Sequence, residues 1–267
     1  MPELAEVEWY SREWDAGLGR RVTAVRVHGG ARVFRGVEAG RLVAGMEGRV
    51  LAGVKRHGKQ LLFGFGGGGW LSVHLGMTGE LRAERPDFEG GKHDHLVLVT
   101  ADAALVFRDP RMFGRVGWDD GEALPEWWLA LPPEVLSKGF TVARVAEFLG
   151  RRRGTPLKAL LLEQAMFPGV GNWMADEVVW RLRVAPGILA GEVDPAAVHR
   201  EVRAVARGAM RTIGRDWSDP PATWLFRHRW KDGGRCPRCG GELVREELRG
   251  RTACHCPACV GAAAARG

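Results

Sequence analysis

All five cysteines of this 267-residue chain lie in one short segment. Cys236-Pro-Arg-Cys239 and Cys256-Pro-Ala-Cys259 form two C-x-x-C pairs that sixteen residues separate. Four thiolates at this spacing are typical of tetrahedral zinc, because each pair turns two sulfurs toward one ion. Four cysteines leave no open coordination position, so we expect one structural Zn²⁺ and no chemistry at the metal.

The segment between the two pairs, GGELVREELRGRTACH, predicts two short strands of a zinc ribbon or finger. Arg249 and Arg251 lie near its expected tip, where they could reach a phosphate or a DNA groove. The fifth thiol, Cys254, is interpreted as a small packed residue, although a role as a ligand stays open.

Composition limits the class of protein. A formal net charge of +7 and a pI of about 9.6 favour polyanionic partners, though many basic proteins bind no nucleic acid. The chain has no run of eighteen apolar residues, so we expect no membrane span. Its start lacks a basic and an apolar signal region, and clustered cysteines favour a metal site over disulfides, so we expect an intracellular protein.

Two kinds of periodicity divide the chain. Leu4, Val7, Tyr10 and Trp14 share one face of a helix expected over Pro2–Gly17. Short apolar runs separated by glycine-rich or polar turns then predict an antiparallel β-sandwich between Arg21 and about Trp118. These runs are Val22–Val27, Leu61–Phe65, Leu71–His74, Leu96–Val99 and Ala104–Phe107.

Helices are expected in the second half of the chain. Thr141, Thr155 and Asp194 are candidate N-caps, and Pro156 is expected at the first helical position before a helix over Leu157–Met166. Gly169–Asn172 predicts a tight turn into a helix that reaches about Leu182. The predicted fold is α+β and multi-domain, with a catalytic β-sandwich domain over 1–118, a linker over 119–140, a helical domain over 141–225, a zinc finger over 226–262 and a tail over 263–267.

Six features occur in the order found in formamidopyrimidine-DNA glycosylases and endonuclease VIII, a bacterial family that this chain resembles over nearly its whole length. Besides the finger, the motifs are Pro2-Glu3-Leu4-Ala5-Glu6-Val7-Glu8, resembling PELPEVE; His57-Gly58-Lys59-Gln60-Leu61-Leu62, resembling R-G-K-x-L-L; His74-Leu75-Gly76-Met77-Thr78-Gly79; Asp109-Pro110-Arg111-Met112-Phe113-Gly114; and Gly169-Val170-Gly171-Asn172 with Ala175-Asp176-Glu177. The resemblance implies a helix–two-turn–helix element around Asn172.

The resemblance also implies an activity, which is base-excision repair of oxidised or ring-opened bases. Once Met1 is removed, the secondary amine of Pro2 would attack the sugar C1′, expel the base and form an iminium, after which β,δ-elimination cuts the strand. An α-amine has a pKa near ~8, so much of it is neutral and nucleophilic at physiological pH. Without the other motifs, Pro2 would be read as a helix N1 proline.

Further roles follow from the resemblance. Glu3 would act as general acid and base, Lys59 would hold a phosphate next to the lesion, and Glu6 and Glu177 would support the site. The alternatives are a helix-start acid for Glu3 and a solvated turn lysine for Lys59.

DNA contacts are expected from two sets of residues. A glycosylase must flip its target base and fill the hole, which the resemblance assigns to Met77, Arg111 and Phe113, although Met77 and Phe113 could be core residues. Backbone phosphates are expected at His74 and Asn172, the latter with the amides of its helix start, and at Lys231 and Arg251. The alternatives are a hydrogen-bonded strand residue for His74 and an ordinary helix-connecting turn for Asn172. The basic run at Arg227, His228, Arg229 and Lys231 is expected to follow the phosphate backbone.

Three departures from the family pattern affect the expected substrate. Ala5 replaces a proline, Trp173 and Met174 follow Asn172 where a tyrosine is usual, and Gly214–Arg235 is short. Family members fold a loop over 8-oxoguanine in this last region, so we do not expect a strong preference for that base.

The expected partner is damaged double-stranded DNA, bound by a cytoplasmic monomer. The alternatives are an inactive DNA-binding relative and an enzyme for bulky or cross-linked lesions.

Overall fold

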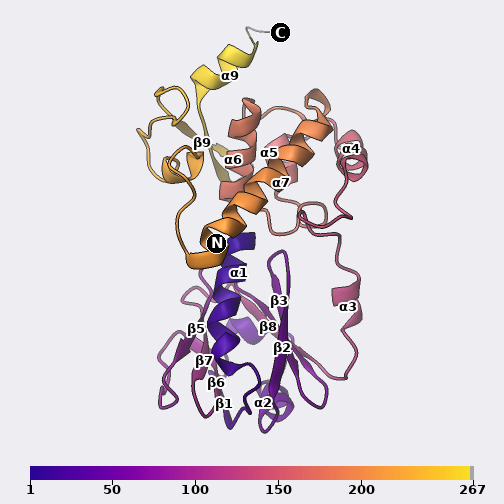
Figure 1. Ribbon diagram of the computed structural model, residues 1–267, viewed down its shortest axis with the longest axis vertical. Helices are drawn as coiled ribbons and strands as arrows, with labels where there is room; N and C mark the ends of the chain where they lie inside the picture. The colour runs from indigo at the N-terminus through magenta and orange to yellow at the C-terminus, as the bar shows by residue number, and fades with distance from the viewer. Residues whose placement is uncertain (265–267) are drawn as a thin grey trace. The chain divides into compact units, whose positions relative to one another are not determined.

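The computed structural model describes residues 1–264, in two compact units (Figure 1). One unit holds Met1–Pro2 and Glu6–Leu131, and the other holds Glu3–Ala5 and the chain from Pro132 onward. Of the expected tail over 263–267, residues 265–267 lie outside the described residues, and helix α9 (Pro257–Ala264) covers the rest. No helix in the described part of the chain is long and apolar enough to span a membrane.

Two four-stranded antiparallel sheets build the first unit, which confirms the predicted sandwich. One sheet has the order β1-β6-β7-β5, from β1 (Ala24–Val27), β6 (Asp94–Val99), β7 (Ala104–Arg108) and β5 (Glu80–Glu84). The other has the order β2-β3-β4-β8, from β2 (Leu51–His57), β3 (Gln60–Phe65), β4 (Trp70–His74) and β8 (Arg115–Asp119). Alternate residues such as Leu61, Val73 and Val116 fill the core between them.

The helices of the first unit differ in part from the prediction. Helix α1 spans Leu4–Arg12 and continues as the 3₁₀ turn η1 (Glu13–Gly17), as expected from its apolar face. The region expected to hold only strands also contains η2 (Arg32–Phe34) and α2 (Ala39–Met46). Helix α2 forms because Leu42 and Met46, four residues apart, are both fully buried. The predicted linker contains a further short helix, α3 (Glu126–Leu129).

The β2–β3 hairpin turns through Gly58 and Lys59. Gly58 has φ +57°, which fits the first central position of a type II′ turn and favours glycine there. The register then pairs Gln60 with His74 across β3 and β4, and His74 with Arg115 across β4 and β8. These three residues therefore form one row on the sheet face that points away from the core.

Helices surround the core of the second unit. They are α4 (Val142–Gly150), α5 (Leu157–Leu161), α6 (Asn172–Leu182), α7 (Pro195–Arg211) and α8 (Ile213–Asp216), with 3₁₀ turns η3 (Ala190–Glu192) and η4 (Leu225–Arg227). Two of the three predicted caps form: Thr141 Oγ1 accepts from the Arg144 amide at 3.3 Å, and Asp194 accepts from the amides of Ala196 and Ala197. The prediction for Thr155 is wrong, because α5 has Pro156 at its N-cap and no side chain caps it.

Helix α5 ends five residues earlier than predicted. The Gln164 side chain explains the early end, because its amide nitrogen donates to the carbonyls of Leu162 and Val170. Its oxygen accepts from the Gly169 amide. These bonds satisfy backbone groups of the loop between α5 and α6 that a longer helix would have used.

The two predicted finger strands are β9 (Val244–Leu248) and β10 (Arg251–His255), which pair antiparallel. Arg249 and Gly250 form the tip with φ of +49° and +73°. Positive φ at both central residues is the signature of a type I′ hairpin, which positions Arg249 and Arg251 at an exposed end.

Candidate active site

The Glu3 carboxylate lies at the start of helix α6 and is only 2% exposed. Its Oε2 accepts from the amides of Gly171 at 2.9 Å and Met174 at 3.1 Å, and its Oε1 accepts from the Trp173 amide at 2.9 Å. Three amide donors and the positive end of the helix dipole stabilise a charged carboxylate. These amides, expected to face a phosphate, bind Glu3 instead, which corrects that part of the interpretation.

Glycine at position 171 makes this contact possible. A Cβ at Gly171 would lie 2.3 Å from the Glu3 Cδ, well inside van der Waals contact. The preceding Gly169 has φ +88°, and its carbonyl accepts from the Leu4 amide at 3.0 Å. The Gly-Val-Gly-Asn turn and the start of α1 therefore fix Glu3 together.

Pro2 and Lys59 are both buried in the first unit. Lys59 is 8% exposed, so it is not the solvated turn lysine of the alternative interpretation. The nitrogen of Pro2 is in a peptide bond to Met1 in this sequence, so it becomes an amine only when Met1 is removed. Glu6 is half-buried.

Asp109 organises the two loops that carry Met77, Arg111 and Phe113. Its buried carboxylate accepts from Thr78 Oγ1 at 2.7 Å on one loop and from the Gly114 amide at 2.7 Å on the other. Phe113 is 43% exposed and the Arg111 guanidinium lies 4.8 Å from its ring centre, so neither is a core residue. The sequence could have predicted that Asp109 links the two loops, because this aspartate opens the D-P-R-x-F-G motif.

His74 is held as a neutral hydrogen-bond donor. Its Nδ1 lies 3.1 Å from the Gly76 amide and accepts its hydrogen, so the ring proton is assigned to Nε2. Burial, followed by the charges of Lys59 and Arg35, lowers the pKa of His74 to about 4. The ring can therefore donate to an anion without carrying a charge itself.

A buried ionic cluster that the sequence did not reveal joins α5, α6 and the finger. Lys158 and Asp176 are each 1% exposed and lie 2.5 Å apart, and Arg229 binds the same carboxylate. This corrects the expectation for Arg229, which is 5% exposed and cannot follow a phosphate backbone. The only signal for Lys158 was a lysine within an otherwise apolar helix.

Two further predicted residues lie on helix α6. The Asn172 side chain donates to the Thr252 carbonyl of β10 at 3.0 Å, and Lys158 donates to the same oxygen. The fully buried Glu177 accepts from Arg181 at 2.8 Å and from the Phe226 amide at 3.2 Å. Burial raises the pKa of Glu177. Within the second unit, Glu177 thus anchors the segment around η4.

The four predicted ligands, Cys236, Cys239, Cys256 and Cys259, converge with all sulfurs within 4.8 Å of one another. Closest sulfur pairs lie 3.5 to 3.8 Å apart, the edge length expected for Zn–S bonds of about 2.3 Å in a tetrahedron. Cys254 lies outside this group, and burial, followed by the Asp176 charge, raises its pKa to about 11. The thiol set fits a zinc ion, and Cys254 fits a packed residue.

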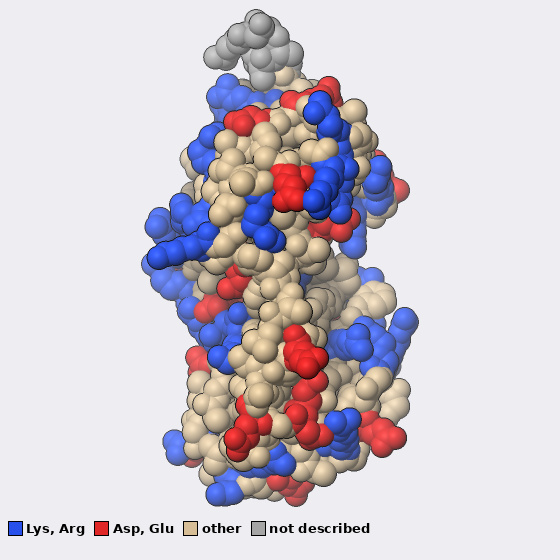
Figure 2. All heavy atoms as spheres, turned by 90° about the vertical axis from the view of Figure 1, so that its right-hand side faces the viewer, with Lys and Arg blue, Asp and Glu red and all other residues tan. Residues whose placement is uncertain are grey.

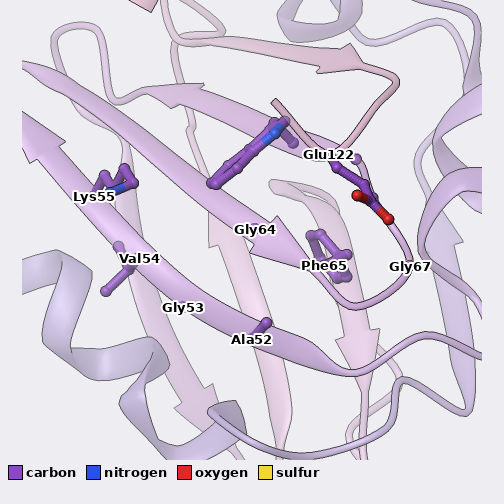
Figure 3. A pocket seen from close by; sticks show the side chains of 11 residues that line it. Ala52, Gly53, Val54, Lys55, Gly64, Phe65, Gly67 and Glu122 are labelled. Carbon is purple, nitrogen blue, oxygen red and sulfur yellow. The ribbon is translucent and has the colours of Figure 1, made fainter. Parts of the chain in front are cut away.

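A hollow of about 390 Å³ lies elsewhere in the first unit, beside the glycine-rich β3–β4 turn (Figure 3). Lys55, Trp70 and Glu122 line it together with several glycines, and no residue of the predicted site does.

Basic side chains are frequent on the face displayed in Figure 2, with fewer acidic groups between them. Lys231 and Arg251 are both exposed, as DNA contacts would need to be.

Comparisons with known proteins agree with this architecture. Residues 1–116 match the formamidopyrimidine-DNA glycosylase N-terminal domain, and residues 131–218 match the H2TH domain of the same enzymes. Formamidopyrimidine-DNA glycosylases of Roseiflexus sp. and Thermus thermophilus are 35% and 36% identical to this chain, over 97% and 98% of it and 99% of each relative. The structure of Lactococcus lactis Fpg with DNA containing an oxidised pyrimidine superposes with a TM-score of 0.86, at 27% identity over 97% of this chain and 99% of that one.

The sandwich, the helix–two-turn–helix element and the four-thiol finger define a DNA-repair glycosylase of the helix–two-turn–helix class. The chain belongs to the formamidopyrimidine-DNA glycosylase family. It is therefore a base-excision-repair glycosylase with AP lyase activity.

Proposed function

We propose that Pro2 is the nucleophile of this glycosylase and that Glu3 is the carboxylate beside it. The observation that carries the proposal is the position of Glu3, since three amides of the α6 start hold the side chain that directly follows Pro2 in the chain. A neutral proline nitrogen would attack C1′ of the damaged nucleotide while the bond from C1′ to the base breaks and the base leaves with a proton.

The remaining steps follow from the covalent intermediate. The proline nitrogen then loses its proton, the C1′–O4′ bond breaks as O4′ takes up a proton, and the resulting iminium acidifies the neighbouring C2′–H. Removal of that proton expels the 3′ phosphate, and a second elimination expels the 5′ phosphate. Glu3, stabilised as a carboxylate, suits the stages that need a proton acceptor and a negative charge near the iminium. Glu6 would assist in orienting these groups.

The proposed substrate is an oxidised or ring-opened base in double-stranded DNA. Structural neighbours support this class, since one is an Fpg complex with an oxidised pyrimidine and another a complex with Fapy-dG. Met77, Arg111 and Phe113 would fill the space of the flipped base, and Asp109 links the two loops that carry them. Lys59, His74, Asn172, Lys231 and Arg251 would contact backbone phosphates.

The finger is proposed to hold one structural Zn²⁺ on Cys236, Cys239, Cys256 and Cys259. The ion would fold the segment that presents Arg251 and would take no part in the reaction. Glu177 would support the site by anchoring the segment around η4, which lies in the short Gly214–Arg235 stretch. We propose that the protein acts as a monomer on DNA in the bacterial cytoplasm.

Trapping with borohydride tests the nucleophile. Protein shown by mass spectrometry to begin at Pro2 is incubated with duplexes that contain an abasic site, a ring-opened guanine, an oxidised pyrimidine or 8-oxoguanine. We expect a covalent cross-link that is lost in Pro2→Gly and in protein that retains Met1, with weak trapping on 8-oxoguanine. Normal strand cleavage by the Met1-retaining form would disprove the role of Pro2.

A further inference from the structure

A row of hydrogen-bond donors crosses the outer face of the β2-β3-β4-β8 sheet. Gln60 and His74 are cross-strand partners, as are His74 and Arg115. Directly paired residues project from the same face with Cβ atoms about 5 Å apart. The amide of Gln60, the imidazole of His74 and the guanidinium of Arg115 therefore lie side by side.

These side chains line a hollow of about 650 Å³ within the first unit. Arg35, which follows η2, lines the same hollow, and its guanidinium donates to the Gly114 carbonyl at 2.9 Å. The next residue, Gly36, has φ +92°, and a Cβ there would lie 3.5 Å from Arg115 Nη2. The segment after η2 thus brings a second guanidinium to the end of the row.

The charge in this hollow is positive where the row lies. Neither Arg35 nor Arg115 forms an ion pair with an acidic side chain in the described part of the chain. Asp119 also lines the hollow, but it lies four residues along β8 from Arg115, about 13 Å at the usual rise per residue, and accepts from Trp127 Nε1. His74 adds a neutral donor at Nε2. Such a set suits a tetrahedral oxyanion.

We propose that this hollow is a subsite for one backbone phosphate of the bound DNA, with Arg115 and Arg35 as charged contacts and Gln60 beside His74 as neutral donors. The inference rests on the proposed function, because Phe113, which is expected to fill the space of the flipped base, lines the same hollow. Arg115, Arg35 and Gln60 lie outside the set of contacts that the motifs assign.

The salt dependence of DNA binding tests the subsite. A duplex with a tetrahydrofuran abasic analogue binds without being cleaved, so the measurement does not depend on Pro2. For Arg115→Gln we expect about tenfold weaker binding at low salt and a slope of log K against log salt that is smaller by about 0.9, the value for one phosphate contact. Arg20→Gln is the matched control, because Arg20 already pairs with Asp102 at 2.7 Å.

Neutral methylphosphonates placed at one backbone position at a time identify the phosphate. One position should weaken binding of the wild type and have no further effect on Arg115→Gln. The proposal is overturned if Arg115→Gln keeps the wild-type slope, or if every methylphosphonate weakens the variant as much as the wild type. If the wild type gives no borohydride cross-link while Arg115→Gln still shows the smaller slope, the proposed role of Pro2 is refuted and the subsite is kept. Arg35→Gln is a second variant, for which we expect the same decrease in slope. Because Arg35 also donates to the Gly114 carbonyl, its salt dependence is interpreted only if the variant melts at the temperature of the wild type.

Discussion

The ammonium of Lys158 and the carboxylate of Asp176 lie 2.5 Å apart and are each 1% exposed, in the core of the second unit. Arg229 binds the same carboxylate, and the Cys254 amide donates to it at 3.2 Å. One acid is thus the shared partner of two buried cations and also accepts from the backbone of finger strand β10. Burial lowers the pKa of Lys158, and the charge of Asp176 opposes that shift.

Replacing the shared acid should therefore be costly. In Asp176→Asn two buried cations lose their counter-charge, and we expect a loss of about 3–5 kcal/mol in the free energy of unfolding, measured in urea. Glu147→Gln is the control, because Glu147 pairs with Arg151 on the exposed face of α4, where such pairs contribute at most about 1 kcal/mol. Equal stability of the two variants would contradict the proposed importance of the buried cluster.

Substitution of Gly171 should impair catalysis more than stability. The methyl of Gly171→Ala would lie 2.3 Å from the Glu3 Cδ, so the carboxylate must leave its three amides. A displacement of about 1 Å at a catalytic group costs on the order of a hundredfold in rate, and we expect such a loss in strand cleavage at abasic sites. Gly150→Ala, at the end of α4 with open space around its Cβ, should keep wild-type activity. A fully active Gly171→Ala would argue against the role of Glu3.

His74 should titrate far below an ordinary histidine. Its pKa in the folded protein is about 4 against a reference of 6.5, so the unfolded chain binds more protons between these values. The resulting stability is fully present above pH 6.5 and is lost as the pH falls from 6.5 toward 4. NMR titration of the imidazole should show this, and Arg35→Gln should raise the pKa because it removes a nearby positive charge. An unchanged pKa in that variant would place Arg35 too far away to act on His74.

The five cysteines should separate into four ligands and one packed thiol. We expect one zinc per chain by elemental analysis, lost in Cys239→Ser and retained in Cys254→Ala. Removal of the ion by a chelator should unfold the finger, because zinc binding contributes folding free energy to such modules. Zinc loss in Cys254→Ala, with the four other thiols intact, would show that the fifth cysteine is a ligand.

Several features were predictable because they depend on local sequence. The paired C-x-x-C motifs, the caps at Thr141 and Asp194 and the strand periodicity each involve residues close together in the chain, and the structure forms them as predicted. Helix α2 was not predicted because it has only eight residues, and so short an apolar segment is hard to distinguish from the strands around it. The early end of α5 was missed because it depends on the side chain of Gln164.

The sequence by itself determined the family, the proline–glutamate start and the four thiol ligands, since each is a fixed spacing of residue types. Only the tertiary structure decided that Glu3 uses the amides of the α6 start, 168 to 171 residues away, and that Arg229 is buried against Asp176. It also brought Gln60, His74 and Arg115 into one row. The physical reason is that burial and strand register depend on contacts between distant segments. The sequence does not distinguish a basic residue that faces solvent from one that faces a buried carboxylate.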